Sequence, residues 1–117
     1  MVRILLVDDD PHFRKTLRLA LRSRDYEVVE AADGIEALDS VAATAPDLIV
    51  LDWHLPNMNG IETCRTLRAR SNLPVIMVSA NRSNSKQRAL EAGANDYISK
   101  PFSLNDLLTR IEAVLER

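Results

Sequence analysis

The fold of this chain is decided by the stretch VRILLVDDDP, residues 2–11. Residues 2–7 have the length of a β-strand, and Ile4 to Val7 follow one another without a polar interruption. Such continuous apolarity is typical of a strand that is buried on both faces in a parallel sheet. Asp10 followed by Pro11 is a typical helix start, with the aspartate as N-cap. The stretch therefore predicts a buried parallel strand that leads through three carboxylates into a helix.

The same alternation recurs along the rest of the chain. Residues 48–51 and 75–78 are further continuous apolar runs, whereas 27–31 and 96–99 are weaker strand candidates, as expected at the edges of a sheet. Helix starts of the capping type follow at Asp33, Asn59 and Ser103. Fivefold strand–helix alternation with right-handed crossovers predicts an α/β fold, (βα)5, with a doubly wound five-stranded parallel sheet.

One segment departs from this pattern. Residues 81–88 are all polar, and only Ala89, Leu90 and Ala92 follow before Gly93. A helix here has little apolar surface with which to dock on the sheet. We expect this segment to be the part of the molecule that moves most easily.

Length and composition restrict the class of protein. The 117 residues form one domain, 1–117, and 46% apolar residues are enough for a full core. Fifteen basic and seventeen acidic side chains give a net charge of -2, so we expect no direct nucleic-acid binding by this domain. A single cysteine, Cys64, and the absence of a signal-peptide pattern or a membrane-length apolar run predict a cytoplasmic protein with no membrane contact.

Chemically active side chains follow four of the predicted strands. They are Asp8 and Asp9 after the first strand, Asp52 after the third, Ser79 after the fourth and Lys100 after the fifth. In a doubly wound sheet these strand ends meet in one crevice, where ligands bind. Three carboxylates against one lysine would repel one another unless a cation binds, and hard oxygen ligands favour Mg²⁺, with Mn²⁺ as the alternative.

With these motifs in this order, the chain resembles, over essentially its whole length, the receiver domain of two-component response regulators. The resemblance implies a CheY-like (flavodoxin-like) fold with strand order 2-1-3-4-5. It implies that Asp52 accepts a phosphoryl group from the phosphohistidine of a sensor histidine kinase, and that the domain catalyses this transfer and the later dephosphorylation itself. Ser79 and Lys100 would contact the phosphoryl group, together with the backbone N–H groups near Trp53 and Ala80.

The resemblance also assigns the metal ligands. Asp9 and Asp52 would bind Mg²⁺ through their carboxylates, Asp8 through a metal-bound water, and His54 through its backbone carbonyl. The side chains of His54 and Asn81 occupy positions that tune the lifetime of the phosphoryl group in this family. Lys100-Pro101 matches a lysine followed by a cis-proline.

Tyr97 matches the aromatic residue that rotates inward when the hydroxyl of Ser79 moves, although it could equally be an ordinary strand aromatic. Four charged residues resemble the dimer surface of receivers in winged-helix transcription regulators: Lys86, Asp96, Asp106 and Arg110. In a homodimer, Lys86 would meet Asp106 of the partner and Asp96 would meet Arg110. The alternative is that Asp106 and Arg110, four residues apart, pair within their own helix.

Other functions remain open at this point. We expect the output, most simply transcription, to come from a separate domain beyond Arg117, with a stand-alone signalling domain as the alternative. An FMN protein of the same fold would need a phosphate-binding loop where the chain has Asp8-Asp9-Asp10, which would repel phosphate. A phosphohydrolase with an aspartyl nucleophile would need a second acid/base and a substrate cap, for which no insertion is long enough.

Overall fold

The computed structural model describes residues 1–80 and 82–116. Asn81, which was predicted to affect the phosphoryl lifetime, and Arg117, beyond which an output domain is expected, lie outside the described residues.

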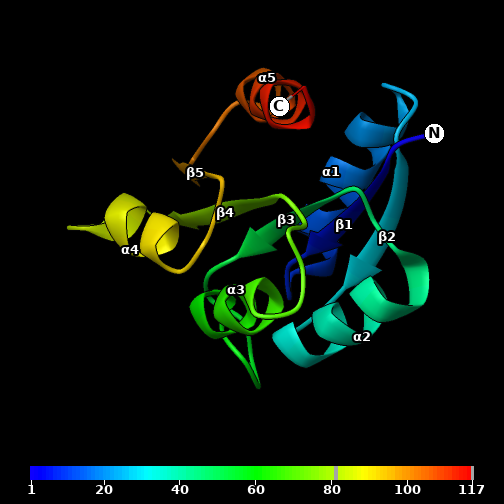
Figure 1. The fold of residues 1–117 in the computed structure, drawn as a ribbon. Helices are drawn as coiled ribbons and strands as arrows, with labels where there is room; N and C mark the ends of the chain where they lie inside the picture. Colours follow the sequence, from blue (N-terminus) through cyan, green and yellow to red (C-terminus); the bar gives the residue numbers. More distant parts are fainter. Residues whose placement is uncertain (81, 117) are drawn as a thin grey trace.

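Strands and helices alternate along the whole chain, as the sequence predicts (Figure 1). The strands are β1 (Arg3–Val7), β2 (Glu27–Ala31), β3 (Leu48–Asp52), β4 (Val75–Ala80) and β5 (Asp96–Lys100). The helices are α1 (Pro11–Arg22), α2 (Gly34–Thr44), α3 (Gly60–Arg68), α4 (Ser85–Glu91) and α5 (Leu104–Leu115). All strand pairs are parallel, and the order β2-β1-β3-β4-β5 confirms the predicted topology, with the two weaker strands at the edges.

Four of the helices begin at the predicted caps. The side chains of Asp10, Asp33, Asn59 and Ser103 each accept a hydrogen bond from a backbone N–H in the first turn. Such caps satisfy N–H groups that have no partner within the helix, which fixes where each helix starts. Three of the caps follow a strand end by two or three residues and so fix the short loops there, whereas Asn59 lies seven residues after the end of β3.

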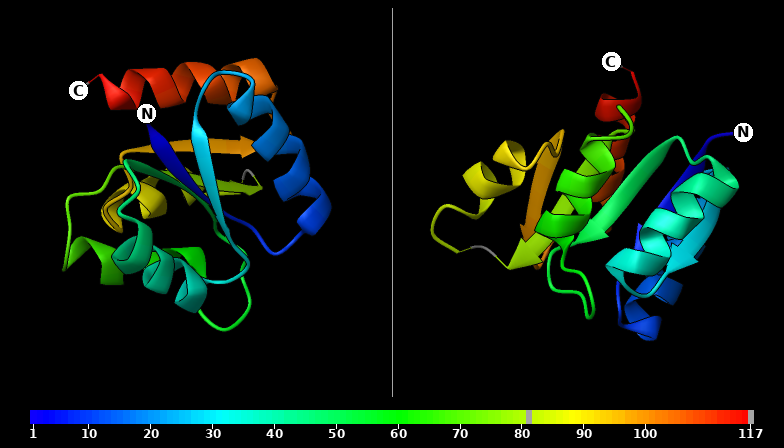
Figure 2. Two further views of the ribbon diagram at one scale, coloured as in Figure 1. Left: turned by 90° about the vertical axis from the view of Figure 1, so that its right-hand side faces the viewer. Right: turned by 60° about the horizontal axis from the view of Figure 1, so that its bottom comes forward.

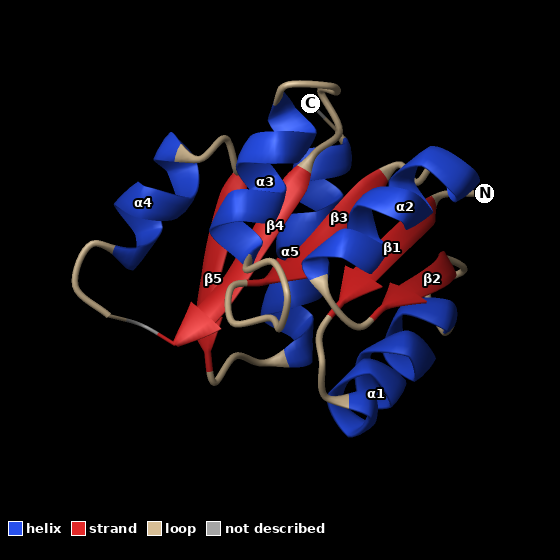
Figure 3. Cartoon of the chain, turned by 90° about the horizontal axis from the view of Figure 1, so that it is seen from below, coloured by secondary structure: helices blue, strands red, loops and turns tan. Residues whose placement is uncertain are grey.

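The helices form a layer on each face of the sheet (Figures 2 and 3). Helices α1 and α5 pack on one face over Ile4, Leu6 and Ile76. Helices α2, α3 and α4 pack on the other face over Leu5 and Met77. Neighbouring residues of one strand therefore enter different cores, which is why β1, β3 and β4 carry continuous apolar runs.

Helix α4 is short and shallowly packed. It has seven residues, of which only Ser85 and Ala89 are buried. The residue before it, Asn84, has a left-handed backbone with φ 63° and makes no side-chain cap. This agrees with the expectation that the segment is weakly anchored.

None of the described helices combines the length and the apolar character needed to span a membrane.

Candidate functional site: an acidic cluster beside Lys100

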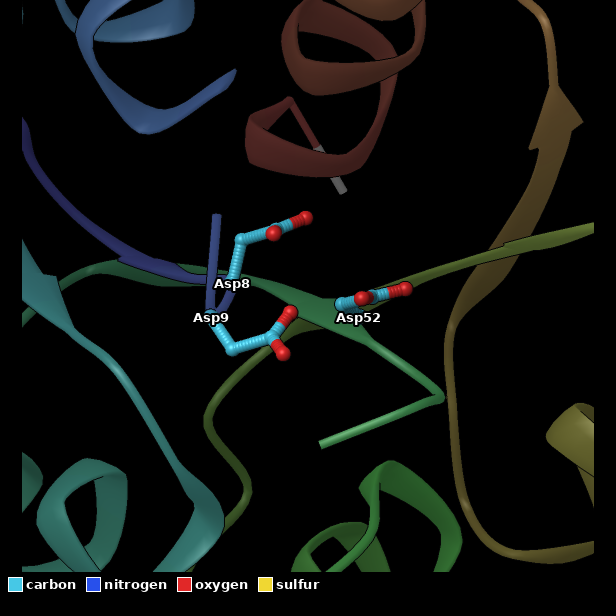
Figure 4. Close-up of side chains that lie close together, drawn as sticks. All are labelled: Asp8, Asp9 and Asp52. Carbon is cyan, nitrogen blue, oxygen red and sulfur yellow. The ribbon is translucent and has the colours of Figure 1, made fainter. Parts of the chain in front are cut away.

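Three carboxylates meet at the carboxyl ends of β1 and β3 (Figure 4). One oxygen from each of Asp8, Asp9 and Asp52 lies within 4.8 Å of the others. Asp8 and Asp52 are buried, with 2% and 6% of their surface exposed, whereas Asp9 is open to solvent. The structure thus brings together the three carboxylates that the sequence predicts to meet.

Lys100 reaches this cluster from the end of β5. Its Nζ lies 3.5 Å from Asp8 Oδ2 and 3.6 Å from Asp52 Oδ1. One ammonium between two buried carboxylates leaves the cluster with an excess of negative charge. The peptide bond between Lys100 and Pro101 is cis, as the resemblance implies.

The surroundings of Asp52 raise its pKa to about 6. Burial is the main cause, since it disfavours the charged carboxylate, and the neighbouring charge of Asp8 adds to it. Lys100 and His54 act in the opposite direction. The folded protein therefore disfavours the charged form of Asp52, and a bound cation would stabilise that form.

The donor set of the cluster fits a hard divalent cation. Its ligands are carboxylate oxygens from two loops, and oxygen ligands of this kind suit Mg²⁺ or Mn²⁺. Asp8 is held in place because its Oδ1 accepts a hydrogen bond of 2.9 Å from the backbone N–H of Asp10. The carboxylate of Asp8 is thereby directed into the cluster before any ion binds.

Arg14 is a supporting residue that the sequence did not reveal. Its Nη1 donates to the backbone carbonyl of Asp8 at 2.6 Å, and its Nε pairs with Glu30 at 3.2 Å. Glu30 also pairs with Arg18 at 2.6 Å. Burial raises the pKa of Glu30, but the two arginines outweigh it and the pKa is lowered overall. In the sequence, the only indication of this contact is the spacing of Arg14 and Arg18, which lie four residues apart and therefore on one face of α1.

The loop after Asp52 is fixed against β4 and α4. The N–H of Trp53 donates to the carbonyl of Val78 at 2.9 Å, and the Trp53 ring is buried. The guanidinium of Arg88 lies 4.9 Å from the centre of that ring, and the exposed His54 stacks on it at 6.5 Å. A phosphoryl contact from the Trp53 N–H would have to share or replace the bond to Val78, so this contact stays a prediction.

Ser79 and Tyr97 meet at one carbonyl group. The Ser79 hydroxyl donates to the Ala80 carbonyl at 3.3 Å, and the Tyr97 hydroxyl donates to the same oxygen at 3.2 Å. Both residues are buried, with 2% and 6% exposed. The Tyr97 ring thus already occupies an inward position, next to the residue expected to move.

The four predicted interface residues lie on α4, β5 and α5. Arg110 pairs within its own chain, at 3.1 Å to both Asp96 and Asp106, and donates to the Tyr97 carbonyl at 3.0 Å. The intramolecular alternative is therefore observed in the single chain. The exposed Lys86 lies on α4, and the contacts between two copies stay a prediction.

Comparison with known proteins places these features in one family. The model of the "response regulator receiver domain" family matches residues 4–112. Response regulator MprA of Mycobacterium tuberculosis (strain H37Rv) is 48% identical over 118 residues, which cover 99% of this chain and 51% of that protein. The chain thus spans about half the length of the curated relatives that it matches.

Solved structures give the same result. The receiver domain of Francisella response regulator 1452 has a TM-score of 0.95 at 32% identity, with 100% of this chain and 98% of that chain covered. A second similar structure is the receiver domain of sensor histidine kinase PA1611 from Pseudomonas aeruginosa PAO1, which has a magnesium ion coordinated in its active-site cleft. It has a TM-score of 0.90 at 33% identity, with 99% of this chain and 98% of that chain covered. Fold, acidic cluster and sequence all agree, and the chain belongs to the receiver domains of two-component response regulators.

Proposed function

We propose that Asp52 is the phosphoacceptor of this receiver domain and takes its phosphoryl group from the phosphohistidine of a sensor histidine kinase. The observation that carries this proposal is the meeting of Asp8, Asp9 and Asp52 beside Lys100 at the strand ends. Asp8 and Asp52 are both buried beside Lys100, but Asp52 is the one at the end of β3, where it pairs with Val78 of β4, next to Ser79.

The residues around the cluster fit a catalytic Mg²⁺ ion, with Mn²⁺ as the alternative. Asp8, Asp9 and Asp52 would hold it, together with the backbone carbonyl of His54. When bound, the ion supplies positive charge that offsets the carboxylates and the phosphoryl oxygens. The magnesium ion in the similar receiver domain of PA1611 supports this assignment.

The chain's own residues account for the transfer step. An oxygen of the Asp52 carboxylate attacks phosphorus, a new O–P bond forms, and the P–N bond to the donor imidazole breaks with its electron pair going to nitrogen. With a pKa of about 6, Asp52 is mostly ionised at neutral pH, as the attack requires. Lys100, the Ser79 hydroxyl and the Ala80 N–H would stabilise the phosphoryl oxygens.

The same site would also hydrolyse the acyl phosphate, so the domain would remove the phosphoryl group from its own residue. The exposed His54, two residues after Asp52, stands where a side chain would influence the attacking water. The lifetime of the phosphoryl group would depend on this residue and on Asn81.

The output would pass through the residues around Ser79. Movement of the Ser79 hydroxyl toward the acyl phosphate changes the hydrogen bonds at the Ala80 carbonyl, which Tyr97 shares. Tyr97 is joined to α5 through Arg110, and α4 is only shallowly packed. We propose that this surface forms a homodimer on phosphorylation and controls transcription through a separate domain, in the cytoplasm. The alternative is a stand-alone domain that signals by protein–protein contact.

The phosphoacceptor assignment is tested by incubating the protein with acetyl phosphate and Mg²⁺ and measuring its intact mass. Wild type should gain one phosphoryl group, and Asp52→Asn should gain none. Asp39→Asn, an exposed aspartate on α2, serves as the matched control and should be labelled like wild type. If Asp52→Asn were labelled as strongly as wild type, Asp52 would not be the phosphoacceptor.

A further inference from the structure

The ammonium of Lys100 lies over an aromatic ring as well as beside two carboxylates. Its Nζ is 4.6 Å from the centre of the Phe13 ring, while Asp8 and Asp52 lie at 3.5 and 3.6 Å. An ammonium within about 6 Å of a ring centre is attracted by the negative face of the ring. Phe13 belongs to the first turn of α1, so this contact joins α1 to the end of β5.

The backbone and the ring of Phe13 are each held by a neighbouring residue. Asp10 caps α1, and its Oδ1 accepts from the N–H of His12 at 2.9 Å and from that of Phe13 at 3.4 Å. The ring of Phe102, two residues after Lys100, makes an edge contact with Phe13 at 6.0 Å and 78°. Phe13 is half-buried against the core between α1 and α5.

We propose that Phe13 is a positioning residue for phosphotransfer, and that the face of its ring holds the Lys100 ammonium where a phosphoryl oxygen will meet it. The inference rests on the proposed function of Asp52.

Competition for the carboxylates explains why such a contact is needed. The carboxylates of Asp8 and Asp52 that attract Lys100 also belong to the set expected to hold the divalent cation. Their attraction for the ammonium therefore weakens when the site is loaded. The face of Phe13 does not belong to that set, so its attraction for the ammonium persists when the site is loaded. A ring face is also a weak acceptor, which leaves the N–H groups of Lys100 for the phosphoryl oxygen.

Open space lies beside the Phe13 ring, where substituents can be added. Phe13, Lys100, Pro101 and Phe102 line an open pocket of about 450 Å³. Because the Phe13 ring borders this open space, small substituents such as fluorine atoms or a hydroxyl group are suitable probes of it.

The direct test replaces Phe13 with 3,4,5-trifluorophenylalanine, which keeps the shape of the ring and weakens its negative face. The initial rate of labelling by acetyl phosphate should fall about two- to fivefold, the range expected for a partly exposed ammonium–ring pair. Phe13→Leu should show a similar fall, and Phe13→Tyr should restore the wild-type rate. The Mg²⁺ titration, followed by the fluorescence of Trp53, should not change.

The chain offers a matched control, because Phe13 and Phe102 are its two phenylalanines. The same fluorinated residue at Phe102 changes the edge contact with Phe13 but not the ring that the ammonium faces, and it should slow labelling less than the change at Phe13 does. The inference would be overturned if wild type and the protein fluorinated at position 13 were labelled at equal rates, or if fluorination at positions 13 and 102 slowed labelling equally. Either result would leave the function of Asp52 standing. If wild type is not labelled at Asp52 at all, the proposed function and this inference fail together.

Discussion

Asp52 carries a charge that the folded protein disfavours. Its pKa is raised to about 6, chiefly by burial, whereas an exposed aspartate has a pKa of 3.8. Between these two pH values the folded state binds more protons than the unfolded state, so the free energy of unfolding falls as the pH rises. This decrease in the free energy of unfolding is complete above the pKa of Asp52 in the folded state. It applies to the protein without a bound cation.

Because ionised Asp52 lowers the free energy of unfolding, we can predict the behaviour of Asp52→Asn in the presence of EDTA. The variant cannot ionise at this position, so at pH 7 its free energy of unfolding should exceed that of wild type by about 1–3 kcal/mol. At pH 4 the difference should shrink, because wild-type Asp52 is then largely protonated in the folded state. Urea unfolding curves at both pH values measure it. A difference that is constant with pH, or a less stable variant at pH 7, would contradict this account of Asp52.

Metal binding can be followed at Trp53, the single tryptophan, which directly follows Asp52. We expect Mg²⁺ to change its fluorescence, and Ca²⁺ to compete less well, because the site offers few carboxylates for a larger coordination shell. Asp9→Ala should shift the titration to more than about tenfold higher Mg²⁺, since it removes one of the three charged ligands. Asp39→Ala removes an exposed aspartate elsewhere and should titrate like wild type. An unchanged titration in Asp9→Ala would place the metal at another site.

At the scale of elements, the approach of α3 to β3 sets the position of the phosphoacceptor loop. Gly60 begins α3, and its N–H donates to the carbonyl of Trp53 at 2.8 Å. A Cβ atom at this position would overlap the carbonyl oxygen of Asp52 and crowd the Cα of Trp53. The glycine is therefore required by the close contact between the helix and the strand end.

Gly60→Ala should consequently push α3 away from β3. We expect a loss of about 1–3 kcal/mol in the free energy of unfolding, typical of overpacking in a filled core, together with slower labelling of Asp52. Arg65→Ala, on the exposed side of the same helix, is the control and should change neither quantity appreciably. Unfolding curves of Gly60→Ala that coincide with those of wild type would refute the close approach.

The elements themselves were largely predictable from local sequence. Continuous apolar runs gave the central strands, and Asp10, Asp33, Asn59 and Ser103 gave the helix starts, because capping depends on residues only a few positions apart. The acidic cluster followed from the rule that parallel strands end at the same edge. Strand order came from the family resemblance.

Contacts between distant residues were not predictable in the same way. Nothing in the local sequence indicates that Lys100 will lie over the ring of Phe13. The hydrogen bonds of Arg14 to Asp8 and Arg110 to the Tyr97 carbonyl depend equally on how helices pack on the sheet. Side-chain geometry of this kind requires the assembled fold.

At the scale of the whole molecule, the proposed homodimer uses the face formed by α4, β5 and α5. Each ion pair occurs twice across a twofold axis, and pairs of about 0.2–1 kcal/mol each would select the geometry more than supply the affinity. Within one chain Arg110 already holds Asp96 and Asp106, so the dimer would have to share or exchange these pairs.

We expect beryllofluoride, a phosphoryl mimic, to shift wild type from monomer toward dimer in sedimentation velocity. Arg110→Glu should prevent the shift, although it also disturbs the pairs within the chain. Lys86→Glu, on the exposed side of α4, tests the surface without that effect and should weaken the dimer. The double variant Lys86→Glu, Asp106→Lys should recover part of the dimer, because the two charges are exchanged across the interface while the pair of Asp106 with Arg110 within the chain is lost. If beryllofluoride leaves the mass of wild type unchanged, this face does not form the dimer.

The most direct test of the central claim is chemical identification of the phosphorylated residue. An acyl phosphate of aspartate is reduced by borohydride to homoserine, whereas a free carboxylate is not. After treatment with acetyl phosphate and Mg²⁺, borohydride reduction and peptide mass spectrometry should find homoserine at position 52 alone, and none when Mg²⁺ is replaced by EDTA. Homoserine at Asp8 or Asp9 instead, or an unmodified Asp52 in protein that has gained a phosphoryl group, would contradict the account.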